Sequence, residues 1–207
     1  MDWFLTTERL GLRRFEPRDL ESIVALDGDP LVMHFINGGT PVPRERIERD
    51  FHPRLVEGWD PLCERDRRTV YCACERHSGA FVGWFFAKRG QHWPDELELG
   101  YRLLRSAWGR GLATEGARAV RDFVFERVQA PGLFATVMRD HRASARVLEK
   151  LGMTLERRYD EADWPFPDRE ALKYSMRRGG DPEGRGPAAT APRALLRAGP
   201  SGAASTA

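Results

Sequence analysis

The fold is decided by residues 96–115, which read ELELGYRLLRSAWGRGLATE. Glutamates alternate with leucines over residues 96–99, and this predicts a strand with one polar and one apolar face. Gly109 and Gly111 follow, and the residues after them place apolar side chains at helical spacing over 109–127. The stretch therefore predicts a strand, a glycine-rich turn and a helix in succession.

This turn has the properties of a phosphate site. The first turn of a helix carries unpaired N–H groups and a partial positive charge, and glycines let a ligand approach that backbone closely. Gly-Lys-Ser/Thr is missing, so it is not a P-loop, and the spacing does not fit a dinucleotide fingerprint. A plain tight turn between a strand and a helix is an equal alternative on these residues alone.

Outward from this stretch, the sequence alternates strands and helices. Period-two patterns and apolar runs predict strands at 10–15, 68–75, 80–88, 96–103, 133–138, 153–159 and 170–176. Helical spacing, Pro starts and Gly stops predict helices at 17–26, 30–36, 43–57, 109–127 and 141–151. We expect an α/β sandwich built on one mixed sheet.

Composition sets the domain organisation. The chain has 207 residues, of which 41% are hydrophobic, enough for one domain with a real core. Residues 1–178 form the expected domain. Residues 179–207 are mostly Gly, Pro and Ala with a few arginines, and we expect a disordered tail because the segment has little to bury.

Charge and cysteine content exclude several classes of protein. The net charge is only +2 and no basic block is visible, so we expect no nucleic-acid partner. Neither a secretory signal nor an apolar run of about 18 residues occurs, so we expect a cytoplasmic protein without membrane contact. Cys63, Cys72 and Cys74 lack metal-ligand spacing, and we expect buried free thiols and no metal.

The segment Trp108–Ala113, read as Trp-Gly-x-Gly-x-Ala, resembles the turn of the GNAT superfamily of acyl-CoA-dependent N-acyltransferases. Two further segments, Thr7–Arg13 and Asp140–Met153, resemble the branch that includes the ribosomal-protein N-terminal (alanine/serine) acetyltransferases. The three matches occur in the family's order and extend over about residues 6–176. The resemblance implies a single GNAT-like domain, with a mixed, mostly antiparallel sheet of six to seven strands flanked by helices.

The resemblance also implies acetyl-CoA as cosubstrate, bound without a metal. The residues that it assigns to the cofactor are Leu103, Trp108, Gly109, Arg110, Gly111, Leu112, Ala113, Thr114, His141 and Ser144. Trp108 replaces the family's usual Gln or Arg, and His141 replaces an Asn that helps to hold the pantetheine arm. An exposed position beside the helix N-cap is the alternative for His141.

Catalysis is assigned to Glu98 and Ser144. We expect Glu98 to be the base, with Glu96 on the same strand face as the second choice, and a solvated or ion-paired carboxylate as the alternative. Ser144 contacts or protonates the thiol, or else only caps a helix. Leu148 stands where many members carry a tyrosine acid, so protonation of the thiolate is unassigned. The N–H of Leu103 is expected to polarise the thioester.

The sequence leaves the acceptor open. It is a primary amine, on a small molecule or a protein N-terminus. Phe35, Trp84 and Trp164 line its cleft or belong to the core. Asp160, Glu161 and Asp163 favour a cationic acceptor or form only a solvated loop. A non-catalytic module that senses acyl-CoA is the rival function, and a homodimer is left open.

Overall fold

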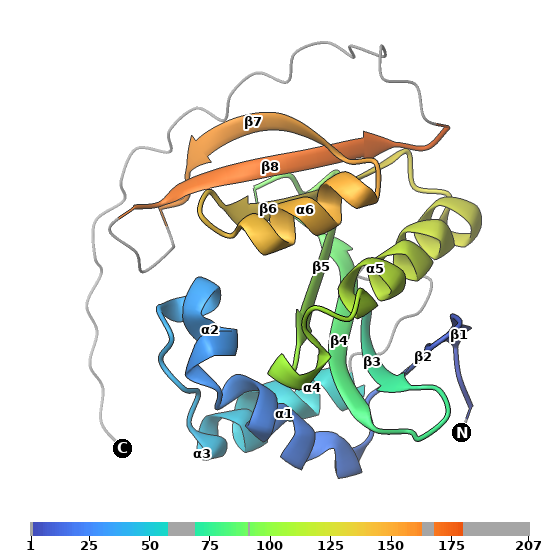
Figure 1. Cartoon of the computed structure of the whole chain (residues 1–207), viewed down its shortest axis with the longest axis vertical. Helices are drawn as coiled ribbons and strands as arrows, with labels where there is room; N and C mark the ends of the chain where they lie inside the picture. The colour runs from blue at the N-terminus through green and yellow to red at the C-terminus, as the bar shows by residue number, and fades with distance from the viewer. Residues whose placement is uncertain (1, 58–68, 91, 163–167, 180–207) are drawn as a thin grey trace, which may run out of the picture.

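The computed structural model describes residues 2–57, 69–90, 92–162 and 168–179. One eight-stranded sheet runs through them in the order β1-β2-β3-β4-β5-β6-β8-β7 (Figure 1). Neighbouring strands in this order are antiparallel except β5 and β6, which are parallel. The strands are β1 (Leu5–Thr6), β2 (Leu10–Arg13), β3 (Thr69–Glu75), β4 (Phe81–Arg89), β5 (Leu97–Leu103), β6 (Gly132–Met138), β7 (Thr154–Asp160) and β8 (Glu170–Arg177).

The mixed, mostly antiparallel sheet is confirmed, but it has one strand more than the six to seven expected. The extra strand is β1, which has two residues. Two residues are too few to show a period in the sequence, and β1 forms because it pairs with β2.

The helices lie near their expected positions. They are α1 (Leu20–Asp27), α2 (Pro30–Asn37), α3 (Arg44–Arg46), α4 (His52–Glu57), α5 (Leu112–Phe123) and α6 (Arg142–Lys150). A wider helical segment at Ile47–Phe51 joins α3 to α4, and another at Val124–Val128 extends α5. Gly109 and Gly111 lie before α5 instead of inside it. Gly152 follows α6 with φ of 85°, as its C-terminal position predicted.

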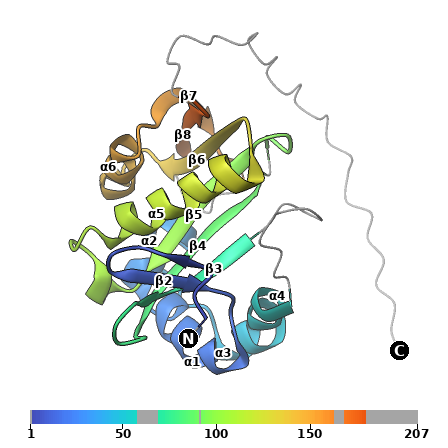
Figure 2. The same cartoon turned by 90° about the vertical axis from the view of Figure 1, so that its right-hand side faces the viewer.

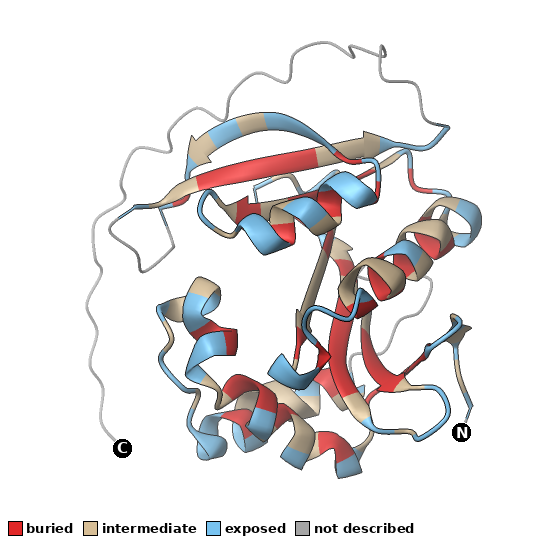
Figure 3. Cartoon of the chain, in the orientation of Figure 1, coloured by how far each residue is buried: buried red, intermediate tan, exposed pale blue. Residues whose placement is uncertain are grey.

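Two hydrophobic cores lie on opposite faces of the sheet (Figures 1, 2). The larger core packs α5 and α6 against one face, and the buried stripe of α5 includes Leu112, Ala117 and Val120. Gly116 lets α5 approach β4 closely, because a Cβ at this position would lie 2.2 Å from the ring of Phe85. The second core packs the α1–α4 region against the other face, and Figure 3 colours the buried residues of both faces red.

Several expectations concern composition. Cys72 and Cys74 are free and buried, as expected, while Cys63 lies outside the described residues. The proposed tail also lies outside them, apart from Gly179, so its disorder stays a prediction. Within the described ranges, no helix is long and apolar enough to cross a bilayer. The same ranges contain no group of three His, Cys, Asp or Glu side chains able to hold a metal ion.

Candidate active site

The turn between β5 and α5 is open and positively polarised. Gly109 and Gly111 are both left-handed, with φ of 71° and 79°, a conformation that favours glycine. A Cβ built on Gly109 would have no atom within 4 Å. The N–H groups of residues 112–114 begin the helix and have no carbonyl partner inside it. The turn therefore fits the phosphate groups of a nucleotide cofactor.

Side chains from the connection between β1 and β2 and from the end of β3 fix the position of this turn. Arg9 Nη1 donates to the Arg110 carbonyl oxygen at 2.9 Å, and Arg9 Nη2 lies 2.6 Å from Glu115 Oε2. Arg110 Nη2 lies 2.6 Å from Glu75 Oε1 at the end of β3. Burial raises the pKa of Glu115, but hydrogen bonds from Thr7 and Arg9 outweigh it and lower the pKa. The turn is thus held by two ion pairs, Arg9 with Glu115 and Arg110 with Glu75.

The two parallel strands separate close to their start. Leu97 pairs with Leu133 and Glu98 pairs with Phe134. Pairing between β5 and β6 ends there, although both strands continue for several described residues. In Figure 1, β5 runs down toward α1 while β6 stays beside α6 and β8. The carboxyl ends of the two strands therefore diverge, and β5 is followed by a short helix (Arg105–Ala107) and then by the glycine turn.

Main-chain groups at the end of β5 face this divergence. Leu104 N–H donates to the Val82 carbonyl oxygen of β4 at 2.9 Å. Because successive N–H groups of a strand point to opposite edges, the N–H of Leu103 points away from β4, toward β6. The Leu103 carbonyl oxygen accepts from Trp108 Nε1 at 2.9 Å. Trp108 thus connects the turn to the strand, and the Leu103 N–H is directed toward the side on which β6 separates from β5.

Tyr101 and Ser144 meet across the divergence. Tyr101 belongs to β5 and Ser144 to the first turn of α6, and their hydroxyl oxygens lie 2.9 Å apart. Burial raises the pKa of Tyr101 to about 12, against a smaller opposite effect of the bond to Ser144. The sequence singled out Ser144 but missed Tyr101, because the pairing depends on how α6 is placed beside β5.

Glu98 lies on the face of β5 opposite to that of Tyr101. Arg102, four residues further along the same face, pairs with Asp27 of α1 at 2.6 Å. The side chain of Glu98 is 18% exposed, and Lys88 Nζ lies 3.3 Å from its Oε2. Burial raises the pKa of Glu98, and the positive charge of Lys88 acts in the opposite direction. A carboxylate of raised pKa is suited to accept a proton near neutral pH.

Glu96, the second choice for the base, is already engaged. Lys173 Nζ lies 2.9 Å from Glu96 Oε1 and 3.0 Å from Glu156 Oε2, and the lysine side chain is 1% exposed. The ammonium also lies over the ring of Trp93, 4.3 Å from its centroid. A glutamate held by a buried lysine is poorly placed to take up a proton, so the geometry favours Glu98.

Glu161 belongs to a buried cluster instead of a solvated loop. It is 6% exposed, and His92 Nε2 lies 2.9 Å from each of its carboxylate oxygens. Tyr159 donates its hydroxyl to Glu161 Oε2 at 3.1 Å. The charges of Glu161 and His92 act on the pKa of Glu98, so the cluster lies beside the proposed base. His92 and Tyr159 were missed because no local pattern marks them.

His141 and Phe35 join α2 to the start of α6. Their rings stack with centroids 4.0 Å apart and planes at 13°. Burial, and then the charge of His34, lower the pKa of His141 to about 4, so the ring is neutral at pH 7. Trp84 is 7% exposed inside the second core, as the core interpretation predicted. Trp164 and Asp163 lie outside the described residues.

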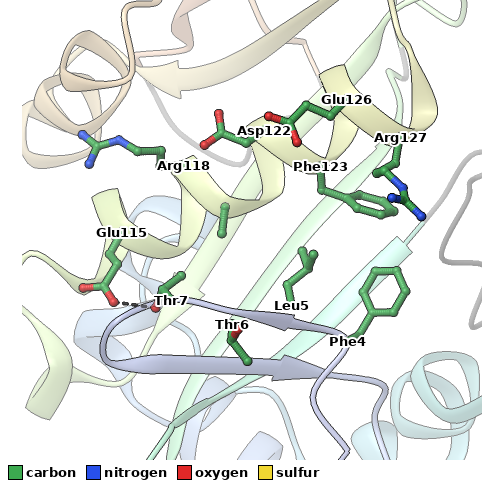
Figure 4. A pocket seen from close by; sticks show the side chains of 11 residues that line it. Phe4, Leu5, Thr6, Thr7, Glu115, Arg118, Asp122, Phe123, Glu126 and Arg127 are labelled. Carbon is green, nitrogen blue, oxygen red and sulfur yellow. Dashed lines mark hydrogen bonds between the residues drawn. The ribbon is translucent and has the colours of Figure 1, made fainter.

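A separate groove of about 720 Å³ lies between β1 and α5 (Figure 4). Phe4 and Leu5 line one side, and Phe123 and Arg127 of the α5 region line the other. Glu115, which anchors the glycine turn, stands at one end of the groove and bonds to Thr7. The residues proposed for catalysis lie elsewhere, on β5 and α6.

Comparison with known proteins agrees with this geometry. The acetyltransferase (GNAT) domain profile matches residues 9–154. An uncharacterised protein of Bacillus subtilis, YkkB, is 28% identical over 173 residues, which are 83% of this chain and 96% of that protein. The FsC-acetyl coenzyme A-N(2)-transacetylase of Aspergillus fumigatus is 27% identical over 184 residues, which are 84% of this chain and 76% of that protein.

Solved structures share the fold. A GNAT-family acetyltransferase of Bacillus anthracis superposes with a TM-score of 0.70 at 22% identity, over 85% of this chain and 99% of that one. Spermidine N-acetyltransferase of Vibrio cholerae, in complex with CoA and spermine, superposes with a TM-score of 0.67 at 12% identity, over 83% of this chain and 97% of that one. The ribosomal L7/L12 acetyltransferase RimL, in complex with CoA, superposes with a TM-score of 0.68 at 17% identity, over 84% of this chain and 97% of that one. With the domain profile over most of its length, the chain belongs to the GNAT family and is an acetyl-CoA-dependent N-acetyltransferase.

Proposed function

We propose that this enzyme moves an acetyl group from acetyl-CoA to a primary amine by direct attack in a ternary complex. One observation carries the proposal. The strand that leads through residues 104–108 to the open glycine turn also holds the largely buried carboxylate of Glu98, and it diverges from β6 between these two points. A cofactor on the turn can therefore extend its arm toward a carboxylate able to take a proton.

The cofactor side of the site uses main-chain groups above all. N–H groups of the turn and of the first turn of α5 bind the pyrophosphate, and the N–H of Leu103 donates to the thioester carbonyl oxygen. The residues that we assign to this side are Leu103, Trp108, Gly109, Arg110, Gly111, Leu112, Ala113, Thr114, His141 and Ser144. The neutral ring of His141, packed on Phe35, lines the site without adding charge.

The chemical step needs a neutral amine and a stabilised leaving group. Acetyl-CoA supplies an activated acetyl group as its thioester. Glu98 removes a proton from the amine, directly or through water, so that nitrogen can form the new bond to the acetyl carbon. Ser144 donates a hydrogen bond from its hydroxyl to the sulfur as the bond between carbon and sulfur breaks.

For the acceptor we propose only a chemical class, a primary amine. Thr7–Arg13 and Asp140–Met153 resemble the ribosomal-protein branch, which favours a protein N-terminus. The fold does not decide, because spermidine and ribosomal-protein acetyltransferases superpose almost equally well. Membership of an acetyltransferase family supports turnover over a non-catalytic sensing role. The buried free thiols Cys72 and Cys74 favour a reducing, cytoplasmic location.

Release of free CoA thiol from acetyl-CoA tests the proposal. The full chain is incubated with a panel of polyamines, aminoglycosides and peptides with free N-termini, each against a matched acceptor with a blocked amine. We expect amine-dependent thiol release with at least one class, together with an acetylated product of the expected mass. Binding of acetyl-CoA without turnover on any amine would instead support the sensing role.

A further inference from the structure

The hydroxyl of Ser144 has one partner among the described side chains, the phenol of Tyr101 at 2.9 Å. The phenol oxygen also lies 3.4 Å from the Ser144 carbonyl oxygen, to which it can donate. Ser144 is 9% exposed. A buried hydroxyl whose acceptor capacity is met by a neighbouring donor has its own hydrogen free for another group.

The direction of the hydrogen bond follows from the two acceptors within reach of the single phenol hydrogen. Ser144 Oγ lies 2.9 Å from the phenol oxygen, nearer than the Ser144 carbonyl oxygen at 3.4 Å. Burial raises the pKa of Tyr101 to about 12, so this hydrogen is retained throughout the neutral range. We assign Tyr101 as the donor and Ser144 Oγ as the acceptor. The Ser144 hydrogen is then left to point away from the phenol.

The Tyr101–Ser144 pair lies where a Ser144 hydroxyl with this orientation can reach the proposed thioester. Tyr101 lies two residues before Leu103, past the point where β5 stops pairing with β6. The Tyr101 side chain reaches the first turn of α6 across this divergence. The Leu103 N–H, which we assign to the thioester carbonyl, points to the same edge of β5. The sulfur of that thioester is therefore expected within reach of the pair.

We propose that Tyr101 is a positioning residue that donates to Ser144 Oγ and so aims the Ser144 hydroxyl at the sulfur that leaves during transfer. The inference rests on the proposed function, in which Ser144 contacts that sulfur. In the step, the amine nitrogen bonds to the acetyl carbon, the bond between carbon and sulfur breaks, and the electron pair stays on sulfur. Glu98 holds the amine proton, and solvent finally protonates the thiolate.

Leu148 stands where many relatives carry a tyrosine acid, and it is 1% exposed within the larger core. It has no proton to give. In this chain the phenol comes from β5 instead of α6, and it acts through a serine. Stabilisation of the thiolate by a fixed O–H donor makes a dedicated acid unnecessary, because the leaving group departs as an anion.

The test uses Tyr101→Phe, Ser144→Ala and the double variant, with Tyr174→Phe as the matched control. Tyr174 lies on β8 and donates to Glu149 of the same helix α6 at 3.3 Å, so Tyr174→Phe removes a comparable phenol that does not contact Ser144. We expect Tyr101→Phe to lower kcat about 10-fold and to leave the KM for acetyl-CoA unchanged, because one hydrogen bond is lost. The double variant should be no slower than Ser144→Ala, since both changes remove the same interaction. Tyr174→Phe should keep the wild-type rate.

A second measurement needs no turnover. CoA and desulfo-CoA are compared by calorimetry, and wild type should bind CoA more tightly because Ser144 donates to the sulfur. Tyr101→Phe and Ser144→Ala should each remove most of this preference, whereas Tyr174→Phe should retain it. Equal preference in wild type and Tyr101→Phe would overturn the inference, as would losses in kcat that multiply in the double variant. If Tyr101→Phe fails to fold, the preference of Ser144→Ala decides: its persistence overturns the inference. Failure of wild type to acetylate any amine would contradict the proposed function alone.

Discussion

At the scale of single residues, Glu98 and Glu96 show how similar side chains acquire different chemistry. They are two residues apart, and the alternating pattern that revealed them treats them alike, but Glu98 lies on β5 whereas Glu96 lies in the bend just before it. Glu96 forms an ion pair with the buried Lys173. Glu98 is ion-paired with the partly exposed Lys88, and its burial raises its pKa. The partner lysine comes from β8, 77 positions away, and no local pattern could have assigned it.

The first prediction compares these two glutamates. Glu98→Gln should lower kcat by about 10²–10³, the range of general base catalysis, and leave the affinity for CoA unchanged. The loss should shrink at high pH, where more of the amine arrives neutral. Glu96→Gln is the matched control, and it should lose stability by leaving Lys173 underpaired but keep its rate per folded molecule. Measured kcat against pH at saturating acetyl-CoA decides, and equal rates for wild type and Glu98→Gln would remove Glu98 from the mechanism.

Lys88 carries the second prediction. Its positive charge favours the ionised form of Glu98, so Lys88→Met should raise the pKa of Glu98 further. Glu98 acts as a base only when ionised, so the rate rises with pH through this pKa. The acid limb of kcat/KM should therefore move to higher pH. Lys88→Arg should restore it, and an unmoved limb in Lys88→Met would show that Glu98 is not the titrating group.

At the scale of elements, the strand, turn and helix over residues 96–115 were predictable because each carries a local signature. The boundaries were less so: α5 begins at Leu112, since the left-handed Gly109 and Gly111 keep the turn out of the helix. The divergence of β5 from β6 and the contact of Tyr101 with Ser144 were not predictable. They depend on how two elements far apart in the sequence are placed by the cores on either side of the sheet.

The glycine turn carries the third prediction. Gly111→Val should abolish binding of acetyl-CoA, because a branched side chain would occupy the approach to the first N–H groups of α5. Valine is also strained at φ of 79°, so some stability will be lost. Gly152→Val is the matched control, since Gly152 has φ of 85°, an open surrounding and a place after α6, away from the turn. Calorimetry on both folded variants should show normal binding for Gly152→Val only; retained affinity in Gly111→Val would refute the site.

At the scale of the whole molecule, the fold class followed from the alternation of elements, and only the short edge strand β1 was missed. The sequence did not show that the sheet consists of two parts joined weakly in the middle. Strands β1–β5 form one part and β6, β8 and β7 the other, and the register between β5 and β6 holds two residue pairs. By contrast, β4 and β5 are joined by seven pairs and β6 and β8 by seven. The candidate site lies where the two parts separate.

The last prediction follows from this division. A ligand that binds only the folded state adds RT ln(1 + [L]/Kd) to stability, about 2.7 kcal/mol at 100 times Kd. For a chain of this size that corresponds to a rise in Tm of roughly 5–11 °C. Acetyl-CoA should produce this rise, and it should protect amides of β5 and β6 from hydrogen exchange, because its arm would lie where these two strands separate. Gly111→Val supplies the control, since it should show neither effect. A rise in Tm with protection confined to α5 would place the nucleotide on the turn but its arm away from β5 and β6, and the assignment of Leu103, Ser144 and Glu98 to the reaction would then be wrong.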